Sequence, residues 1–216
     1  MIRLSIVTPA DANYKRVQEF ARSVYDAKLH AAIGGDPDYF AVAQLSASDA
    51  YVGCFGLYRG DTHQPLLIET YFQDDLFRQL TKMDDAPRAW FGELGTRAVD
   101  LTREMARFSV PVSVALAGAI ILFAANEGFR YLAFTANRSV RGIAKALGTT
   151  LCPLGEPDLS RKDPEFQKIW EHFFSIKQSC FYIDVLLSKE GCRRALSDLS
   201  LKGLIEYPPE KLMCVN

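Results

Sequence analysis

The feature of this sequence that most constrains its fold is an uncharged segment from Phe108 to Asn126, closed by Arg107 and Glu127. A helix that is apolar on every face must be covered on most sides, by a large protein core or by lipid. The strongly apolar part is shorter than the ~20 residues that a membrane span needs. Ser113 is placed to cap its start, and Gly128 stands where a C-terminal glycine is expected. These features favour a buried core helix and predict no transmembrane segment.

Composition and charge limit the class of protein. The 216 residues fit one domain, expected over residues 1–200, followed by a tail over residues 201–216. The net charge is −1 without a Lys/Arg-rich run, which argues against a nucleic-acid partner. The five cysteines are scattered without CxxC spacing and there are three histidines, so we expect reduced thiols and no metal site. The N-terminal residues lack the apolar core of a signal peptide, which predicts a cytoplasmic protein.

Hydrophobic periodicity predicts strands and helices in an order typical of an α/β (α+β) fold. The expected strands lie at residues 2–7, 39–45, 51–59, 65–72, 88–94, 130–137 and 180–187. The expected helices lie at residues 13–30, 113–127, 138–148 and 188–199, with two more that open near Asp74 and at Pro164. Short strands separated by polar turns favour antiparallel hairpins. Together these elements predict a mixed, mostly antiparallel twisted sheet with helices on both faces.

That order resembles the GNAT-type acyltransferase fold and the related acyl-homoserine-lactone synthases. Three stretches resemble the thermostable hemolysin family more closely, and the resemblance extends from about Arg16 to Val185. They are PLLIETYFQDDLFRQL, centred on Glu69 and Tyr71; FGELGTRA, with Glu93 and Gly95; and GFRYLAFTANRSVRGIAKALG. The segment WEHFF matches a motif of that family, a Trp with two aromatic residues, more loosely.

The chain departs from the family pattern in two places. Arg97 stands where the family usually has an apolar residue, which would create a charged site that the relatives lack. The segment after WEHFF also lacks the family's proline.

The family name and the fold that it resembles imply different activities. The name implies a membrane-active cytolysin, whereas GNAT-type enzymes are acyltransferases. The sequence has neither an export signal nor an exposed amphipathic membrane segment, so we favour an N-acyltransferase. A cytolysin and a catalytically silent GNAT-like binding module stay open as alternatives.

The resemblance implies an active site in which two central strands splay apart around the pantetheine arm of a thioester donor. A carboxylate on a neighbouring strand then takes the proton from an attacking amine. Glu93 is predicted to be this base, because the apolar residues Trp90, Phe91 and Leu94 would desolvate its carboxyl group and raise its pKa. The alternative is an edge-strand glutamate that faces water or pairs with Arg97.

Glu69, with similar apolar neighbours, is the second candidate carboxylate. It is expected to orient the ammonium substrate together with Glu93, or alternatively to bond backbone at a strand end. The other residues expected to contact substrate are Tyr71, Trp90, Arg97 and Thr135. The residues expected to bind the donor's phosphate or an acidic carrier surface are Arg103, Arg107, Asn137, Arg138 and Arg141.

Several of the residues expected to bind the phosphate or the carrier surface have a simpler alternative role. Asn137 is favoured as the N-cap of the helix that follows it, because asparagine strongly prefers that position. Arg103 and Arg107 are more simply explained as part of a solvated helix face.

The donor is expected to be a carrier-bound thioester. GNAT-type enzymes carry a glycine-containing loop whose N–H groups bind pyrophosphate ahead of the long helix. Here the corresponding stretch is ARFSVPVSVALAG, which lacks those glycines and contains a proline. The acyl-homoserine-lactone synthases also do without this loop and take acyl groups from acyl carrier protein. We therefore expect the phosphopantetheine of acyl carrier protein in preference to coenzyme A, a small amine as acceptor, and no metal.

Overall fold

The computed structural model describes residues 1–29, 35–63, 65–71, 86–101, 103–156, 158, 164, 167 and 178–207. The strands are β1 (Ile2–Val7), β2 (Tyr39–Leu45), β3 (Tyr51–Arg59), β4 (Phe91–Val99), β5 (Tyr131–Ala136), β6 (Cys152–Gly155), β7 (Ser179–Asp184) and β8 (Ile205–Glu206). The α-helices are α1 (Tyr14–Leu29), α3 (Ser109–Asn126), α4 (Arg138–Ala146) and α6 (Val185–Leu201). The short 3-10 helices are η1 (Leu67–Tyr71), η2 (Arg88–Trp90) and η3 (Arg103–Phe108).

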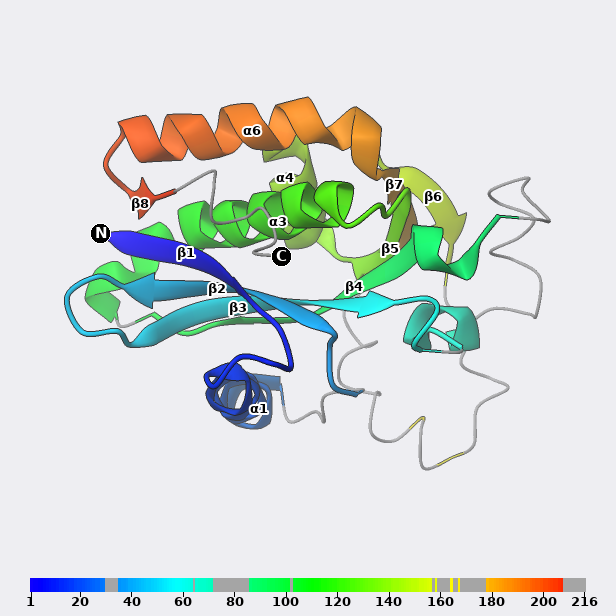
Figure 1. The fold of residues 1–216 in the computed structure, drawn as a ribbon, viewed down its shortest axis with the longest axis horizontal. Helices are drawn as coiled ribbons and strands as arrows, with labels where there is room; N and C mark the ends of the chain where they lie inside the picture. Colours follow the sequence, from blue (N-terminus) through cyan, green and yellow to red (C-terminus); the bar gives the residue numbers. More distant parts are fainter. Residues whose placement is uncertain are drawn as a thin grey trace.

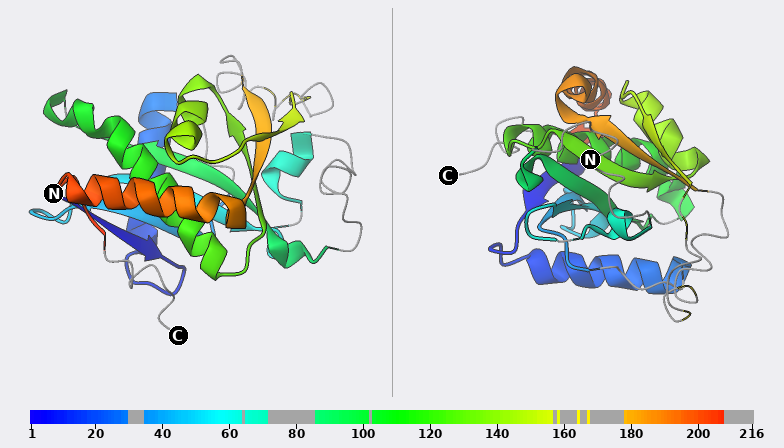
Figure 2. Two further views of the ribbon diagram at one scale, coloured as in Figure 1. Left: turned by 90° about the horizontal axis from the view of Figure 1, so that it is seen from above. Right: turned by 90° about the vertical axis from the view of Figure 1, so that its right-hand side faces the viewer.

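Within the described part of the chain, the strands form one eight-stranded sheet in the order β6-β7-β5-β4-β3-β2-β1-β8. Neighbouring strands are antiparallel except for the pairs β4–β5 and β1–β8, which are parallel. Helix α1 covers one face of the sheet, whereas α3, α4 and α6 cover the opposite face (Figures 1 and 2). The predicted mixed, mostly antiparallel sheet with helices on both faces is confirmed.

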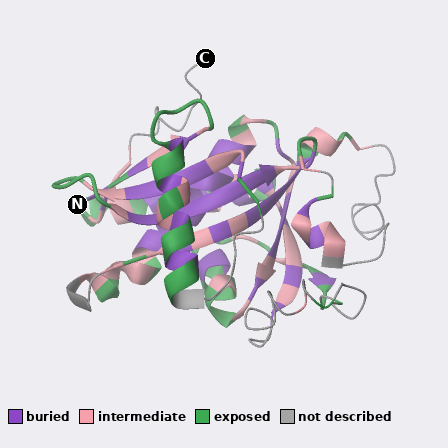
Figure 3. Cartoon of the chain, turned by 90° about the horizontal axis from the view of Figure 1, so that it is seen from below, coloured by how far each residue is buried: buried purple, intermediate pink, exposed green. Residues whose placement is uncertain are grey.

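Helix α1 is amphipathic, as its sequence predicts. Val17, Ala21 and Val24 recur at helical spacing, and all three are buried in a cluster with residues of the sheet. The outer side of the helix is exposed, as Figure 3 shows. The burial of one apolar stripe therefore holds α1 against the sheet.

Helix α3 is the core helix that the apolar segment predicts. Every residue from Val112 to Ala124 is buried. A Cβ atom on Gly118 would come within 3.2 Å of Leu147, at the end of α4, and 3.3 Å of Leu196 in α6, so this glycine allows the helices to approach closely. By length and composition alone, Met105–Asn126 is the one helix in the described ranges that could cross a membrane, yet 72% of its most apolar stretch is buried within the protein.

The start of α3 differs from the prediction, whereas its end agrees with it. The N-cap residue is Phe108, so the predicted cap Ser113 is instead a buried residue inside the helix. Pro111 is tolerated because it lies in the first turn, where its missing N–H has no helical partner. At the other end, Gly128 follows the C-cap residue Glu127 with a left-handed φ of 84°.

The strand predicted at residues 65–72 is wrong for the residues that are described, because Leu67–Tyr71 forms η1. The Glu69 carboxylate accepts a hydrogen bond from the backbone N–H of Leu66 at 2.8 Å, and the Thr70 hydroxyl donates to the carbonyl of Leu67. Side chains that bond nearby backbone in this way compete with a strand ladder and favour a turn. Local capping therefore overrides the apolar pattern of this segment.

Three further boundaries differ from the prediction. Strand β7 ends at Asp184, whose carboxylate accepts hydrogen bonds from the first turn of α6, so the predicted strand residues that follow it are helical. Strand β4 begins at Phe91, after η2, and continues to Val99. In the predicted tail, β8 pairs with β1 and so belongs to the sheet. The predicted helix near Asp74, most of the one opening at Pro164, and the WEHFF motif lie outside the described residues.

Candidate active site

The parallel strands β4 and β5 separate in the middle of the sheet. They pair through Phe91 with Tyr131, Gly92 with Leu132, and Glu93 with Ala133. Beyond these pairs β4 continues to Val99 and β5 to Ala136, and no further pairing joins these described residues. The predicted splay of two central strands is present, and Glu93 is the last β4 residue before it opens.

A β-bulge in β4 lies at Thr96 and Arg97, further along the strand than Glu93. Across β3 and β4, Cys54 is paired with Ala98 and Gly56 with Gly95, so Thr96 and Arg97 together stand opposite one β3 residue. Thr96 has a left-handed φ of 50°. Its hydroxyl bonds the hydroxyl of Tyr58 at 2.5 Å, which helps to hold this uncommon conformation. A bulge bends its strand, so it contributes to the separation of β4 from β5.

The carboxyl group of Glu93 is buried, with 6% of the residue exposed. Burial raises the pKa of Glu93 to about 8, opposed by the backbone N–H groups of Ile68 and Leu67 and reinforced by the negative charge of Glu69. The Ile68 N–H donates to Glu93 Oε2 at 2.9 Å. The predicted desolvation of Glu93 is therefore confirmed. The alternative of an edge-strand glutamate is wrong, because β4 lies between β3 and β5, and Arg97 is not its partner in the described structure.

Glu69 is held by Arg88, which the sequence did not single out. Arg88 Nη1 donates to Glu69 Oε1 at 2.6 Å and Arg88 Nη2 donates to Oε2 at 2.7 Å, a two-bond guanidinium–carboxylate pair. Arg88 Nε also donates to the carbonyl of Gly60 at 2.9 Å. The expected pair of carboxylates on neighbouring strands is thus not formed. Glu69 lies on η1 with a cation already bound, and it also bonds the backbone N–H of Leu66, which is the backbone contact expected as the alternative for this residue.

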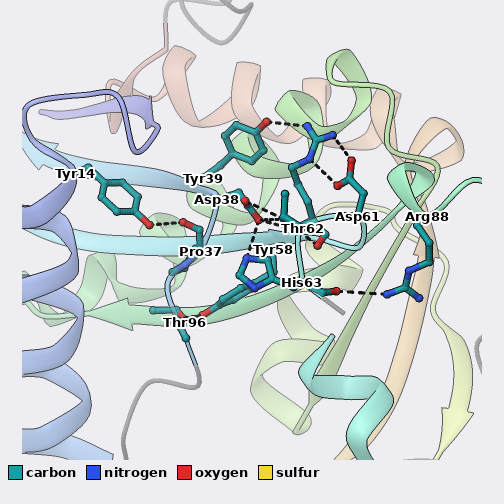
Figure 4. Close-up of polar contacts among 12 residues, drawn as sticks. Tyr14, Pro37, Asp38, Tyr39, Tyr58, Asp61, Thr62, His63, Arg88 and Thr96 are labelled. Atoms are coloured by element: carbon teal, nitrogen blue, oxygen red, sulfur yellow. Dashed lines mark hydrogen bonds and ion pairs between the residues drawn. The ribbon is translucent and has the colours of Figure 1, made fainter. Parts of the chain in front are cut away.

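A second polar network includes Asp38, Tyr58 and His63, and Figure 4 shows it. Asp38 Oδ2 accepts from the backbone N–H of Arg59 at 2.7 Å and lies 3.0 Å from His63 Nε2. The His63 ring packs edge-on against Tyr58, with ring centroids 5.2 Å apart. Tyr58 is the β3 residue that stands opposite Glu93 in the sheet. Sequence analysis missed these residues because their only signal is the strand register, which places Tyr58 beside Glu93.

The other predicted site residues are dispersed around this centre. Asn137 is confirmed as the N-cap of α4, since its Oδ1 accepts from the N–H groups of Ser139 at 2.9 Å and Val140 at 3.1 Å. Arg107 is exposed, with its guanidinium 4.8 Å from the Phe108 ring centre. Exposed positions are also taken by Trp90, Arg138 and Arg141, whereas Thr135 is half-buried on β5. The side chains of Tyr71 and Arg103 lie outside the described residues.

A cavity lies beside the splayed strands, on the face covered by α3 and α4. Its walls include Leu94 of β4, Phe134 of β5, Ala117 of α3 and Ile143 of α4. Arg97 supplies the one charged side chain among the lining residues that are described. In the described ranges, no three His, Cys, Asp or Glu side chains come together as metal ligands would. The apolar cavity thus lies against Leu94 and Arg97 of β4, whereas the carboxyl group of Glu93, at the start of the gap between the strands, bonds the backbone of η1.

Comparison with solved structures finds the same fold in acyl-transferring synthases. BjaI, a CoA-dependent acyl-homoserine lactone synthase solved with SAM and isopentyl-CoA, matches with a TM-score of 0.58 and 14% identity over 99% of this chain and 96% of that one. MesI, a CoA-dependent acyl-homoserine lactone synthase, matches at 0.55 and 21% identity over 91% and 95%. FeeM, an N-acyl amino acid synthase from uncultured soil microbes, matches at 0.55 and 13% identity over 88% and 98%. The GNAT-like fold class is thereby confirmed.

Sequence comparison identifies the family. No curated protein sequence matches this chain. The family model described as thermostable hemolysin matches residues 7–185, close to the range over which the motifs resemble that family. The motifs around Glu69, Glu93 and α4 all lie within the match. The chain therefore belongs to the thermostable hemolysin family.

Proposed function

We propose that this protein is an N-acyltransferase that moves an acyl group from a pantetheine thioester to a small amine. The observation that carries this proposal is the position of Glu93, a buried carboxyl group at the point where β4 and β5 separate. A thioester placed in the gap between the strands would meet an amine beside that carboxyl group. The solved structures of similar fold, described as acyl-homoserine lactone and N-acyl amino acid synthases, support the same class of reaction.

Glu93 is proposed to be the general base. With a pKa of about 8, a minor fraction of Glu93 is ionised at neutral pH and most of it above pH 8. The ionised carboxylate takes a proton from the amine as the nitrogen attacks the thioester carbonyl carbon. The C–N bond forms, the C–S bond breaks, and the electron pair leaves on sulfur, which gains a proton to become the free thiol. A base whose pKa lies near the working pH is effective in such a step.

The donor is proposed as a phosphopantetheine thioester, supplied by acyl carrier protein or by coenzyme A. The missing glycine loop before α3 favours acyl carrier protein as a partner, whereas two solved structures of similar fold are described as CoA-dependent. Both donors present the same thioester to Glu93. A cytoplasmic location, where both donors occur, is part of this proposal.

The test is acyl transfer by the purified protein with acyl carrier protein and coenzyme A thioesters and a panel of small amines. Release of free thiol that depends on the amine, with an amide of the expected mass, is the expected result. Glu93→Gln should lower kcat by about 10²-fold or more, because a general base contributes about that factor. Glu190→Gln, at an exposed position on α6, is the matched control and should leave kcat unchanged.

Two outcomes would count against the proposal. Absence of amine-dependent thiol release across all donors would reject acyl transfer. Unchanged turnover in Glu93→Gln would reject the role of Glu93 while leaving the reaction class intact. A thermal shift with a pantetheine ligand in the absence of turnover would instead favour a catalytically silent binding module.

The family description favours a second candidate, a membrane-active cytolysin. Lysis by α3 would require this helix to leave a core in which Val112 to Ala124 are all buried. Exposing that much apolar surface costs about 25 cal/mol per Å², which makes release of α3 from the folded protein unfavourable. Incubation of red cells with detergent-free purified protein separates the candidates, since an acyltransferase of this kind causes no lysis at micromolar concentration.

A further inference from the structure

Arg97 differs from the other partly buried arginines of the described structure, because no carboxylate of the described residues accompanies it. Arg88 is paired with Glu69 at 2.6 Å, and Arg130 is paired with Asp184 at 3.0 Å. The Arg97 side chain instead donates from Nη1 to the hydroxyl of Ser113 at 3.2 Å. Burial lowers the pKa of Arg97, and Tyr25 opposes this shift.

An arginine in this position still carries its charge, because the guanidinium group does not lose its proton in proteins. Taking such a charge out of water without a counter-ion is unfavourable, since one neutral hydroxyl replaces little of its hydration. Ser113, its partner, is itself 3% exposed. Among the described residues, no carboxylate compensates this positive charge at the junction of β4 and α3, and an anionic ligand would offset its cost.

The surroundings of Arg97 indicate the shape of that ligand. Arg97 lies in the β4 bulge, beyond the last pairing with β5, and so at the open part of the gap between the strands. It lines the same cavity as the apolar side chains of Leu94, Ala117 and Phe134. A site with apolar walls and one cation fits a flexible arm that ends in an anionic group.

The other cationic positions near the gap are less suited to this role. The N–H groups of Ser139 and Val140 at the start of α4 are already bonded by the side chain of Asn137. Arg138 and Arg141 are exposed, so solvent and salt screen their charges. Among the described residues, Arg97 is the cation that lines the cavity beside the gap.

We propose that Arg97 binds the phosphate of the donor's 4′-phosphopantetheine arm and takes over the task of the absent glycine loop. This inference rests on the proposed acyl-transfer function, because it assumes a pantetheine thioester in the gap. The phosphate is common to coenzyme A and to acyl carrier protein, so the chemistry at Arg97 is the same for both donors. Arg97, which stands where the family usually has an apolar residue, is then a donor-binding residue of this chain.

The test is calorimetric titration of the purified protein with 4′-phosphopantetheine and with pantetheine, which lacks the phosphate. Wild-type protein should bind 4′-phosphopantetheine about tenfold or more tightly than pantetheine, because a charge-assisted hydrogen bond contributes at least that much. Arg97→Met should bind the two equally and keep the wild-type affinity for pantetheine. Arg97→Lys, which keeps the charge, should retain part of the preference. Arg193→Met, an exposed arginine on α6, should retain all of it.

Further measurements identify the source of the phosphate and check folding. Titration with coenzyme A and with phosphopantetheine-loaded acyl carrier protein shows which donor gains from Arg97. Thermal unfolding of unliganded Arg97→Met should occur at or above the wild-type temperature, since the substitution removes a partly buried charge that has no carboxylate partner among the described residues. A role of Arg97 in folding alone would instead lower that temperature and leave the phosphate preference in the folded fraction.

Several results would overturn the inference. These are an equal affinity of the wild-type protein for both compounds, no binding of either compound, or a preference that survives in Arg97→Met. If Arg107→Met loses the preference for the phosphorylated compound and Arg97→Met keeps it, the phosphate binds at the exposed Arg107 instead. Because the readout is binding, the two proposals can fail separately. A phosphate preference without turnover would support the role of Arg97 and reject acyl transfer. Turnover with an unchanged donor KM in Arg97→Met would support acyl transfer and reject the role of Arg97.

Discussion

The backbone N–H of Ile68 donates a hydrogen bond to Glu93 Oε2 at 2.9 Å, so a short 3-10 helix holds the buried carboxyl group. That helix, η1, is in turn fastened to the chain before β4 by the pair of Glu69 and Arg88. The two glutamates, which belong to separate family motifs, thus lie in unlike surroundings. Burial raises the pKa of Glu93 to about 8, whereas the carboxylate of Glu69 is ion-paired with the guanidinium group of Arg88.

The pH dependence of acyl transfer should report the pKa of Glu93. Since burial raises this pKa to about 8 and a general base acts in its ionised form, kcat/KM should fall about tenfold per pH unit below pH 8 and level off above it. An acceptor amine whose own pKa lies well below 8 removes the amine's titration from the profile. A profile that is level between pH 6 and pH 9 with such an amine would contradict the assignment.

The stability of the protein should depend on Glu93 in the same pH range. The folded pKa of about 8 lies above the ordinary value of 4.5, so the protonated form is favoured by folding. Its contribution is fully present below pH 4.5 and is lost as pH rises through 8. At pH 9 Glu93→Gln should therefore unfold at a higher temperature than wild type, with a free energy of unfolding larger by about a few kcal/mol. The difference should shrink toward pH 5, which unfolding curves at several pH values would show.

Arg88 should control the pKa of Glu93 from a distance. In Arg88→Met, η1 loses its fastening, so the Ile68 hydrogen bond that lowers the pKa of Glu93 weakens. The charge of Glu69 is also left without its neutralising partner. Both effects raise the pKa of Glu93, so the midpoint of the pH profile should move to higher pH. Carbon-13 NMR titration of the glutamate carboxyl groups measures this without relying on turnover.

The matched control for Arg88 is Arg3→Met, which breaks an exposed ion pair with Asp49 on the β1 side of the sheet. This substitution should leave the midpoint unchanged. An unchanged midpoint in Arg88→Met as well would show that η1 keeps its place over Glu93 without the ion pair.

Two aspartate substitutions in α3 should separate a core helix from a membrane-active one. Leu122 is 5% exposed, so Leu122→Asp places a charge in the core and should cost roughly 3–5 kcal/mol of stability. Val110 is 66% exposed on the same helix, and Val110→Asp should cost less than about 0.5 kcal/mol. Denaturant unfolding measures both, and equal costs would contradict the burial pattern of α3.

Asn137 should act on stability and not on donor binding. Its side chain caps α4 with hydrogen bonds to the N–H groups of Ser139 and Val140, so Asn137→Ala should cost about 1 kcal/mol. Asn137→Asp, which also caps well, should restore most of the loss. The KM for the thioester donor should stay within twofold in both variants, and a large rise in KM with unchanged stability would assign Asn137 to the donor site instead.

Several features of the fold could be predicted because they depend on neighbours in the chain. The buried stripe of α1 follows from the spacing of Val17, Ala21 and Val24, and the cap of α4 follows from Asn137 at its start. The apolar pattern of residues 65–72 wrongly predicted a strand, because Glu69 and Thr70 bond the nearby backbone. Apolar pattern and local capping conflicted there, and the capping prevailed.

The sequence by itself determined that the segment from Phe108 to Asn126 forms an apolar helix and that Glu93 lies among apolar neighbours, since both follow from residues adjacent in the chain. Only the tertiary structure decided that α3 is covered by the sheet and α6, and that Glu69 is bound by Arg88. Only the tertiary structure shows that Arg97 has no carboxylate partner among the described residues. These outcomes depend on contacts between residues far apart in sequence, and each is set by how strands and helices pack rather than by the residues beside them.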